Sequence, residues 1–190
     1  MSQAVLDRTN QRAVGFAHPR AIDAGLVVAG SLVMAACAHV SIPLWFTPVP
    51  ITLQTFGVML LALTLGGWRA SAALVLYLAE GVSGLPVFSP HGTGGIFGPT
   101  GGYLMSYPFA ALAAGLLARN LSRLSRPLVY AASTLVCEII IFAAGGFWLM
   151  ALTHQSSAAI FIAAVLPFIP GEVLKGAAAV ATALGTRKIL

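Results

Sequence analysis

Pro167-Phe168-Ile169-Pro170-Gly171-Glu172-Val173-Leu174-Lys175 lies in the last apolar segment of a chain that has very few charges. Glu172 and Lys175 are three residues apart, so on a helix both side chains project from one face. A charge at membrane depth costs roughly 2.5–3.5 kcal/mol on insertion scales, and it therefore normally faces a cavity or a partner. The acid and the amine together can bind a ligand that has both donors and acceptors. They can also simply neutralise each other as an internal ion pair.

The composition around this stretch indicates an integral membrane protein. Of the 190 residues, 58% are hydrophobic and 8% are charged, whereas a soluble domain has about 25% charged residues. Such a chain has too little polar surface to cover an exterior exposed to water. Its length suits one all-α domain over residues 1–190, a bundle of six transmembrane helices of about 20 residues each in a lipid bilayer. The net charge of +5 comes from basic residues dispersed at segment ends, so we expect no nucleic acid partner.

The apolar segments predict where the six helices lie. We expect transmembrane helices over residues 22–40, 52–65, 70–81, 104–118, 127–149 and 170–184. A polar segment, residues 1–20, precedes them. The apolar run 158–166 is too short to span a bilayer by itself, because it ends at Pro167.

The basic residues predict the orientation of the bundle. Nine of the ten Lys and Arg residues lie in the N-terminal segment, in the turns 66–69 and 119–126, or at the C-terminus. The other three loops have none, and Lys175 is the tenth basic residue. Because Lys and Arg are enriched on the cytoplasmic side, we expect both termini in the cytoplasm and the chain in a bacterial-type cytoplasmic membrane.

Three acids and one base are expected at a similar depth. Counting 1.5 Å per residue from the segment boundaries places Glu80 and Glu138 roughly 16 Å, and Lys175 roughly 18 Å, from the cytoplasmic side, and we expect Glu172, about one helical turn from Lys175, to lie at a similar depth. Full ionisation would leave a costly excess of negative charge, so we expect some acids to be protonated or to have a ligand partner. This arrangement leaves a second function open, an ion-coupled small-molecule carrier in which the three acids form a proton relay.

Small residues recur every four positions in the first apolar segment. Ala21, Gly25 and Ala29 fall on one helix face, and small side chains at this spacing let another helix approach closely. The face is a candidate docking surface for a separate membrane subunit. Packing within the bundle, or against a second copy of the same chain in a homo-oligomer, would require the same pattern.

Two uncharged outward loops are candidates for closing a ligand pocket. Residues 41–51 are punctuated by proline and contain Trp45 and Phe46, which suit a membrane interface or a lid. Residues 85–103 are rich in glycine and proline, and glycine lets the backbone come close to a ligand. A flexible connector would have a similar composition. The second loop is not a phosphate-binding P-loop, because no Gly-Lys-Ser/Thr sequence follows Gly98.

Five stretches, in this order and over most of the chain, together resemble the BioY family, the biotin-specific substrate-binding (S) subunits of energy-coupling factor (ECF) transporters. They are Ser41-Ile42-Pro43-Leu44, Val49-Pro50-Ile51-Thr52-Leu53-Gln54-Thr55-Phe56-Gly57-Val58, Gly84-Leu85-Pro86-Val87-Phe88, Phe97-Gly98-Pro99-Thr100-Gly101-Gly102-Tyr103 and the stretch 167–175. The resemblance implies a six-helix membrane protein with a biotin pocket near its outer face. It also implies that the first and third outward loops help to close that pocket.

The resemblance also implies particular site residues. Matching this chain to the family motifs predicts a substrate site made of Thr52, Gln54, Gly98, Thr100, Gly101, Tyr103, Glu172 and Lys175. Glu172 stands where the family pattern leads us to expect Asp, so the longer side chain is expected to shift that contact. Glu80 and His91 match no motif of the family.

The remaining implications concern partners and chemistry. The resemblance implies a transmembrane coupling subunit and ABC-type ATPase subunits as partners. No Walker A sequence is present, so this chain itself cannot hydrolyse ATP by a P-loop mechanism. No nucleophile–base pair is evident, and no residues have metal-ligand spacing. We therefore expect no enzyme activity, no cofactor and no metal.

Overall fold

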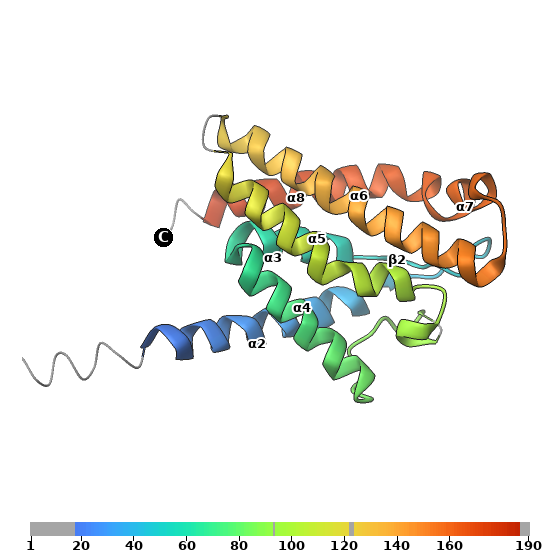
Figure 1. Ribbon diagram of the computed structural model, residues 1–190, viewed down its shortest axis with the longest axis horizontal. Helices are drawn as coiled ribbons and strands as arrows, with labels where there is room; N and C mark the ends of the chain where they lie inside the picture. The colour runs from blue at the N-terminus through green and yellow to red at the C-terminus, as the bar shows by residue number, and fades with distance from the viewer. Residues whose placement is uncertain (1–17, 93, 122–123, 187–190) are drawn as a thin grey trace, which may run out of the picture.

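The computed structural model describes residues 18–92, 94–121 and 124–186, which are mostly helical. Six helical segments run along the bundle in these residues: α2 (His18–His39), α3 (Gln54–Leu65), α4 (Gly67–Val82), α5 (Gly101–Asn120), α6 (Arg126–Thr153), and α7 (Ser157–Ala164) together with α8 (Ile169–Thr186) (Figure 1). The short elements are β1 (Ser41–Ile42), β2 (Ile51–Thr52) and two 3-10 turns, η1 (Gly95–Phe97) and η2 (Leu166–Phe168). The prediction of an all-α bundle with six membrane segments is confirmed.

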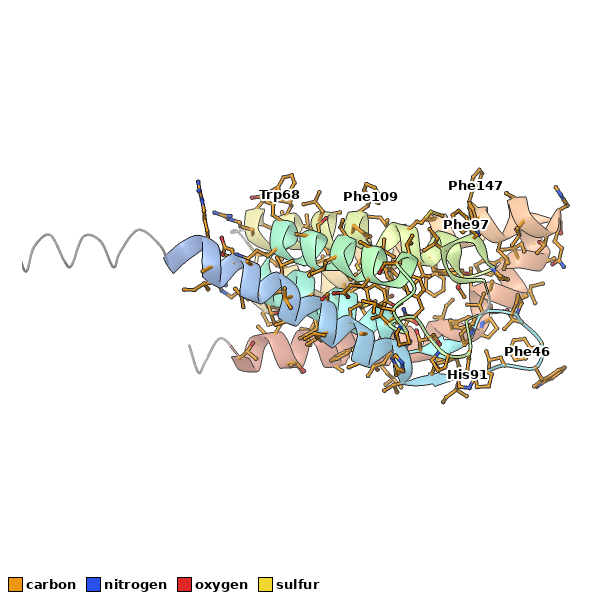
Figure 2. The ribbon with its side chains drawn as sticks, turned by 90° about the horizontal axis from the view of Figure 1, so that it is seen from below. Phe46, Trp68, His91, Phe97, Phe109 and Phe147 are labelled. Carbon is orange, nitrogen blue, oxygen red and sulfur yellow. The ribbon has the colours of Figure 1, made fainter. Side chains whose placement is uncertain are left out.

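The outer surface of the bundle is that of a multi-pass membrane protein. Four helical stretches in the described residues are long and apolar enough to cross a bilayer: Arg20–His39, Gly101–Asn120, Arg126–Thr153 and Ser157–Thr186. Large apolar side chains point away from the bundle, and Trp68, Phe109 and Phe147 project from its surface in Figure 2, each about 70% exposed. A water-soluble protein rarely exposes so much contiguous apolar surface.

The short helix α3 lies at the centre of the bundle. It contacts α2, α4, α5, α6 and α8. The turns α3–α4 and α5–α6 lie at one end of the molecule, together with the start of α2 and the end of α8 (Figure 1). The β1–β2 connection, the loop before α5 and the α6–α7 connection lie at the opposite end, which we call the loop end. This division agrees with the predicted alternation of inward turns and outward loops.

The α3–α4 turn is tighter than predicted. α3 ends at Leu65 and α4 begins at Gly67, so Gly66, with a positive φ of 81°, reverses the chain alone. A Cβ on Gly115 would lie 2.2 Å from the backbone nitrogen of Gly67. Gly66 therefore makes the turn possible, and Gly115, which has no side chain, lets the backbone of this turn pack directly against the backbone of α5.

Two other boundaries differ from the prediction at the loop end. α5 begins at Gly101, so the last part of the glycine-rich stretch is helix rather than loop. The first loop holds a two-residue antiparallel ribbon, in which Ser41 pairs with Thr52 and Ile42 with Ile51. The ribbon brings the end of α2 beside the start of α3, and it places Thr52 directly before the first turn of α3.

Candidate ligand-binding site

An internal cavity lies beneath the loops, between α3, α5, α6 and α8. Its apolar wall includes Val49, Phe88, Leu104, Ile141, Phe142 and Phe168, and its polar groups include Thr52, Gln54, Thr55, Thr100, Glu172 and Lys175. The cavity has a volume of about 50 Å³, which is enough for several water molecules. A mostly apolar cavity with a few convergent polar groups is the usual form of a small-molecule site.

The polar centre of the cavity is a buried ion pair on α8. Lys175 Nζ lies 2.7 Å from Glu172 Oε1 and also donates a hydrogen bond to Thr55 Oγ1 at 3.1 Å. The side chains of Lys175 and Glu172 are only 12% and 5% exposed. Glu172 Oε2 is buried and has no hydrogen-bond partner among the described residues. A buried acceptor of this kind is costly unless something bonds to it.

The sequence explains why this pair forms where it does. Pro170 lies in the first turn of α8, where its fixed φ is favourable and its missing N–H costs nothing. Glu172 lies in the same turn, where the positive end of the helix dipole favours a carboxylate. Lys175 follows three residues later on the same face, as the spacing predicts. The start of α8 therefore places both Glu172 and Lys175 at the cavity.

The first-loop residues enter the cavity from the start of α3. The backbone N–H of Gln54 donates to Thr52 Oγ1 at 3.3 Å, so the Thr52 side chain satisfies one free N–H of the helix start. The amide nitrogen Nε2 of Gln54 donates to the Tyr77 hydroxyl at 2.8 Å. Gln54 is 4% exposed. Both predicted residues of this loop therefore line the cavity in ordered positions.

The glycine-rich stretch contributes only part of what was predicted. Thr100 and Tyr103 line the cavity, whereas Gly98 and Gly101 are outside the described lining. A Cβ on Gly101 would lie 2.0 Å from the carbonyl oxygen of Ile96 and 3.1 Å from Trp148 Nε1. Gly101 thus gives room to its own loop and to α6. The Trp148 indole N–H also donates to the carbonyl of Gly98 at 2.9 Å, which fastens the loop to α6.

Tyr103 faces the cavity with its ring while its hydroxyl is engaged elsewhere. The hydroxyl donates to the carbonyl of Ala164 at 3.1 Å, at the end of α7. A Cβ on Gly145 would lie 2.4 Å from the ring, so glycine on α6 makes room for it. Tyr103 therefore offers a ligand an aromatic face more readily than a hydroxyl group.

Several cavity residues were not predicted as site residues. Thr55 lies three residues after Thr52 and next to Gln54 in the sequence. This closeness to two predicted site residues could have identified Thr55 as a cavity residue. Phe168 lies within the quoted stretch 167–175. Phe142 and Tyr107 also line the cavity, but they lie in long apolar helices whose sequence does not distinguish them from neighbouring core residues.

Of the three acids expected at one depth, the fold separates Glu80 from Glu138 and Glu172. Glu80 accepts a hydrogen bond from Ser31 at 3.1 Å between α2 and α4, and its second oxygen is buried without a partner in the described residues. Glu138 lies with Glu172 along an outer groove between α6 and α8. Only Glu172 of the three lines the cavity. His91 and Ser41 are hydrogen-bonded at 2.7 Å, which joins the two outward loops.

The predicted docking face is exposed in the described part of the chain. Ala21, Gly25 and Ala29 are all exposed on α2. A Cβ on Gly25 would meet no atom within 4 Å. Among the described residues, nothing at this position therefore requires a glycine.

The fold and the cavity define a class, a multi-pass membrane protein with a mostly apolar internal cavity at one end of its helices. A family model, the BioY family, matches residues 9–190. The chain belongs to the BioY family.

Similar proteins come from bacteria and archaea. The biotin transporter BioY of Rhodobacter capsulatus is 41% identical over 76% of this chain and 82% of its own length. The biotin transporter BioY of Thermotoga maritima is 38% identical over 80% of this chain and 88% of its own length. A probable biotin transporter BioY of Pyrococcus horikoshii is 37% identical over 70% of this chain and 77% of its own length.

A solved structure has the same fold. The S-component for biotin from an ECF-type ABC transporter matches with a TM-score of 0.81 at 24% sequence identity, over 90% of this chain and 94% of its own. The arrangement of α2 to α8 therefore matches the fold of that solved structure.

Proposed function

We propose that this chain binds biotin in the cavity at its loop end and takes it up across the cytoplasmic membrane as the substrate-specific subunit of an ECF-type transporter. Membership of the BioY family supports this proposal. The observation that carries it is the buried Glu172–Lys175 pair, which lines a mostly apolar cavity and in which Glu172 Oε2 has no hydrogen-bond partner among the described residues.

The chemistry of the cavity suits biotin. Biotin is a small apolar bicycle whose ureido group has two N–H donors and one carbonyl acceptor, and it also carries a valerate carboxylate. The free Oε2 of Glu172 accepts from a ureido N–H, and Lys175 or Gln54 donates to the ureido carbonyl. Phe142, Phe168 and the ring of Tyr103 pack against the apolar bicycle and its sulfur. One ureido N–H and the ureido carbonyl thus have complementary groups in this cavity.

Transport requires partners that supply energy. The sequence has no Walker A motif, so we propose that ATP is hydrolysed by separate ABC-type ATPase subunits and that a transmembrane coupling subunit connects them to this chain. The exposed small-residue face of α2, at Ala21, Gly25 and Ala29, is the proposed docking surface, because another helix can approach it closely. The chain itself acts as a transport protein and not as an enzyme.

Calorimetry of the purified full chain tests the ligand. We expect saturable biotin binding and no binding of thiamine or riboflavin at the same concentrations. A folded chain that binds thiamine or riboflavin and not biotin would refute the assignment of the substrate.

An uptake assay tests the mechanism. We expect biotin uptake by cells that contain the coupling and ATPase subunits to stop when ATP is depleted. Gly25→Leu is expected to abolish this uptake while leaving biotin binding by the isolated chain unchanged. Uptake that proceeds without those subunits and collapses with the proton gradient would instead support an ion-coupled carrier.

A further inference from the structure

Tyr77 lies outside the cavity and still contacts two of the residues that form its wall. It is on α4 and is fully buried. Its hydroxyl accepts the hydrogen bond from Gln54 Nε2 at 2.8 Å. Its ring packs edge to face on Phe88, with ring centroids 5.4 Å apart and an angle of 75° between the planes. Gln54 and Phe88 both line the cavity.

We propose that Tyr77 is a positioning residue for ligand binding, which holds the Gln54 amide and the Phe88 ring in place on the cavity wall. This inference rests on the proposed function, since it assigns a role in binding the same ligand. Tyr77 itself does not touch the ligand. It acts through two residues that lie on different segments, α3 and the loop before α5.

The hydroxyl of Tyr77 holds the Gln54 side chain in one orientation. Gln54 is buried, and an amide N–H without a partner there costs free energy. The bond to Tyr77 uses one amide N–H and leaves the second N–H and the carbonyl oxygen for a ligand. A side chain already fixed in this way does not need to be ordered when the ligand binds, so part of the entropic cost of binding is removed.

The ring of Tyr77 forms one side of a socket for Phe88. Gly81 lies four residues after Tyr77, and hence on the same face of α4. A Cβ on Gly81 would lie 2.1–2.4 Å from atoms of the Phe88 ring. Glycine is therefore required for the ring to sit there. Ser89 and Gly92, which follow Phe88 in the loop, also line the cavity, so the socket positions a whole section of the wall.

The other tyrosines provide a matched control. Tyr103 and Tyr107 line the cavity themselves. Tyr130 is 2% exposed and belongs to a separate apolar cluster with Leu63, Val129 and Ala183. Tyr130→Phe therefore removes a hydroxyl from a buried tyrosine without touching the cavity wall, and it shows what this change does to the chain in general.

A double-mutant cycle on the full chain tests the hydroxyl. Biotin affinity is measured by calorimetry for Tyr77→Phe in the wild-type chain and in the Gln54→Ala background. We expect Tyr77→Phe to weaken binding about five- to tenfold in the wild type and less than twofold in Gln54→Ala. Tyr130→Phe is expected to change affinity less than twofold in both. A purely structural role for Tyr77 would not produce this dependence on Gln54.

A second variant tests the socket. Gly81→Ala pushes the Phe88 ring out of place and is expected to weaken biotin binding about fivefold. Gly185→Ala, at a position where a Cβ meets no atom within 4 Å, is expected to leave it unchanged. Tyr77→Phe that weakens binding equally in both backgrounds, or in neither, would overturn the inference while leaving the proposed function intact. A wild-type chain that binds no biotin would overturn both.

Discussion

Two ion pairs in this protein have the same N···O distance, but one is exposed to solvent and the other is buried. Arg69 Nη2 lies 2.7 Å from Asp23 Oδ1 and connects α4 to α2, with side chains 49% and 45% exposed. Lys175 Nζ also lies 2.7 Å from Glu172 Oε1, within α8, with side chains 12% and 5% exposed. The first pair lies toward the end of the bundle with the short turns, and the second lies in the cavity at the loop end.

The difference in burial determines what each pair contributes. An exposed ion pair typically stabilises a protein by about 0.2–1 kcal/mol and is screened by salt. A buried pair is often no more stabilising than apolar residues of the same volume, although removing one partner costs about 3–5 kcal/mol. Stability alone therefore does not account for Lys175 and Glu172. Their position in the cavity, with Glu172 Oε2 unpaired among the described residues, fits the ligand-binding role proposed for them.

Breaking the buried pair is expected to have the largest effect. In Lys175→Ala, biotin affinity should fall at least about 100-fold, because a charged donor is lost and Glu172 is left buried without its partner. Thermal unfolding should move to lower temperature at the same time. Calorimetry and a thermal melt of the detergent-solubilised chain measure both effects. Affinity within threefold of wild type would remove Lys175 from the site.

A second change at the same pair separates stability from binding. Adding Glu172→Gln to Lys175→Ala removes the uncompensated charge, so the thermal midpoint should recover most of the way toward wild type. Biotin affinity should stay low, since the carboxylate acceptor has been lost as well. The melt and the calorimetric titration of the double variant check this. Recovery of binding together with stability would mean that the pair serves only the fold.

Gly101→Val is expected to have an intermediate effect, about a tenfold loss of biotin affinity. The new side chain would collide with the carbonyl of Ile96 and crowd Trp148, so the loop before α5 would move and the thermal midpoint should fall with the affinity. Gly185→Val is the control, because no atom lies near its Cβ. A loss of affinity with an unchanged thermal midpoint would indicate that Gly101 faces the ligand directly.

Breaking the exposed pair is expected to have the smallest effect. Arg69→Ala should change biotin affinity less than twofold and the free energy of unfolding by about 0.2–1 kcal/mol. Because salt screens exposed charges, the change in stability should shrink further between about 0.01 and 1 M ionic strength. Denaturant unfolding of the detergent-solubilised chain at the two salt concentrations measures it. A loss of biotin binding in this variant would show that the two pairs are not independent.

The sequence by itself determined the features that depend on composition and on neighbours along the chain. The low charge content predicted a membrane protein, and the apolar runs predicted its six segments. The three-residue spacing of Glu172 and Lys175 predicted that they share a face, because helical geometry alone sets that relation. Motif resemblance added Thr52, Gln54, Thr100 and Tyr103, which also line the cavity.

The tertiary structure decided which residues from distant parts of the sequence contact one another. The periodicity within one segment does not predict contacts between segments. Thr55 bonds to Lys175 across 120 positions, and Gln54 bonds to Tyr77 across 23. Glu80, expected at the depth of the site, instead faces Ser31 on α2. Each of these contacts depends on how neighbouring helices are rotated about their axes and how closely they pack. Those two quantities are set by side chains of several segments at once, which is why only the assembled bundle defines the complete wall of the cavity.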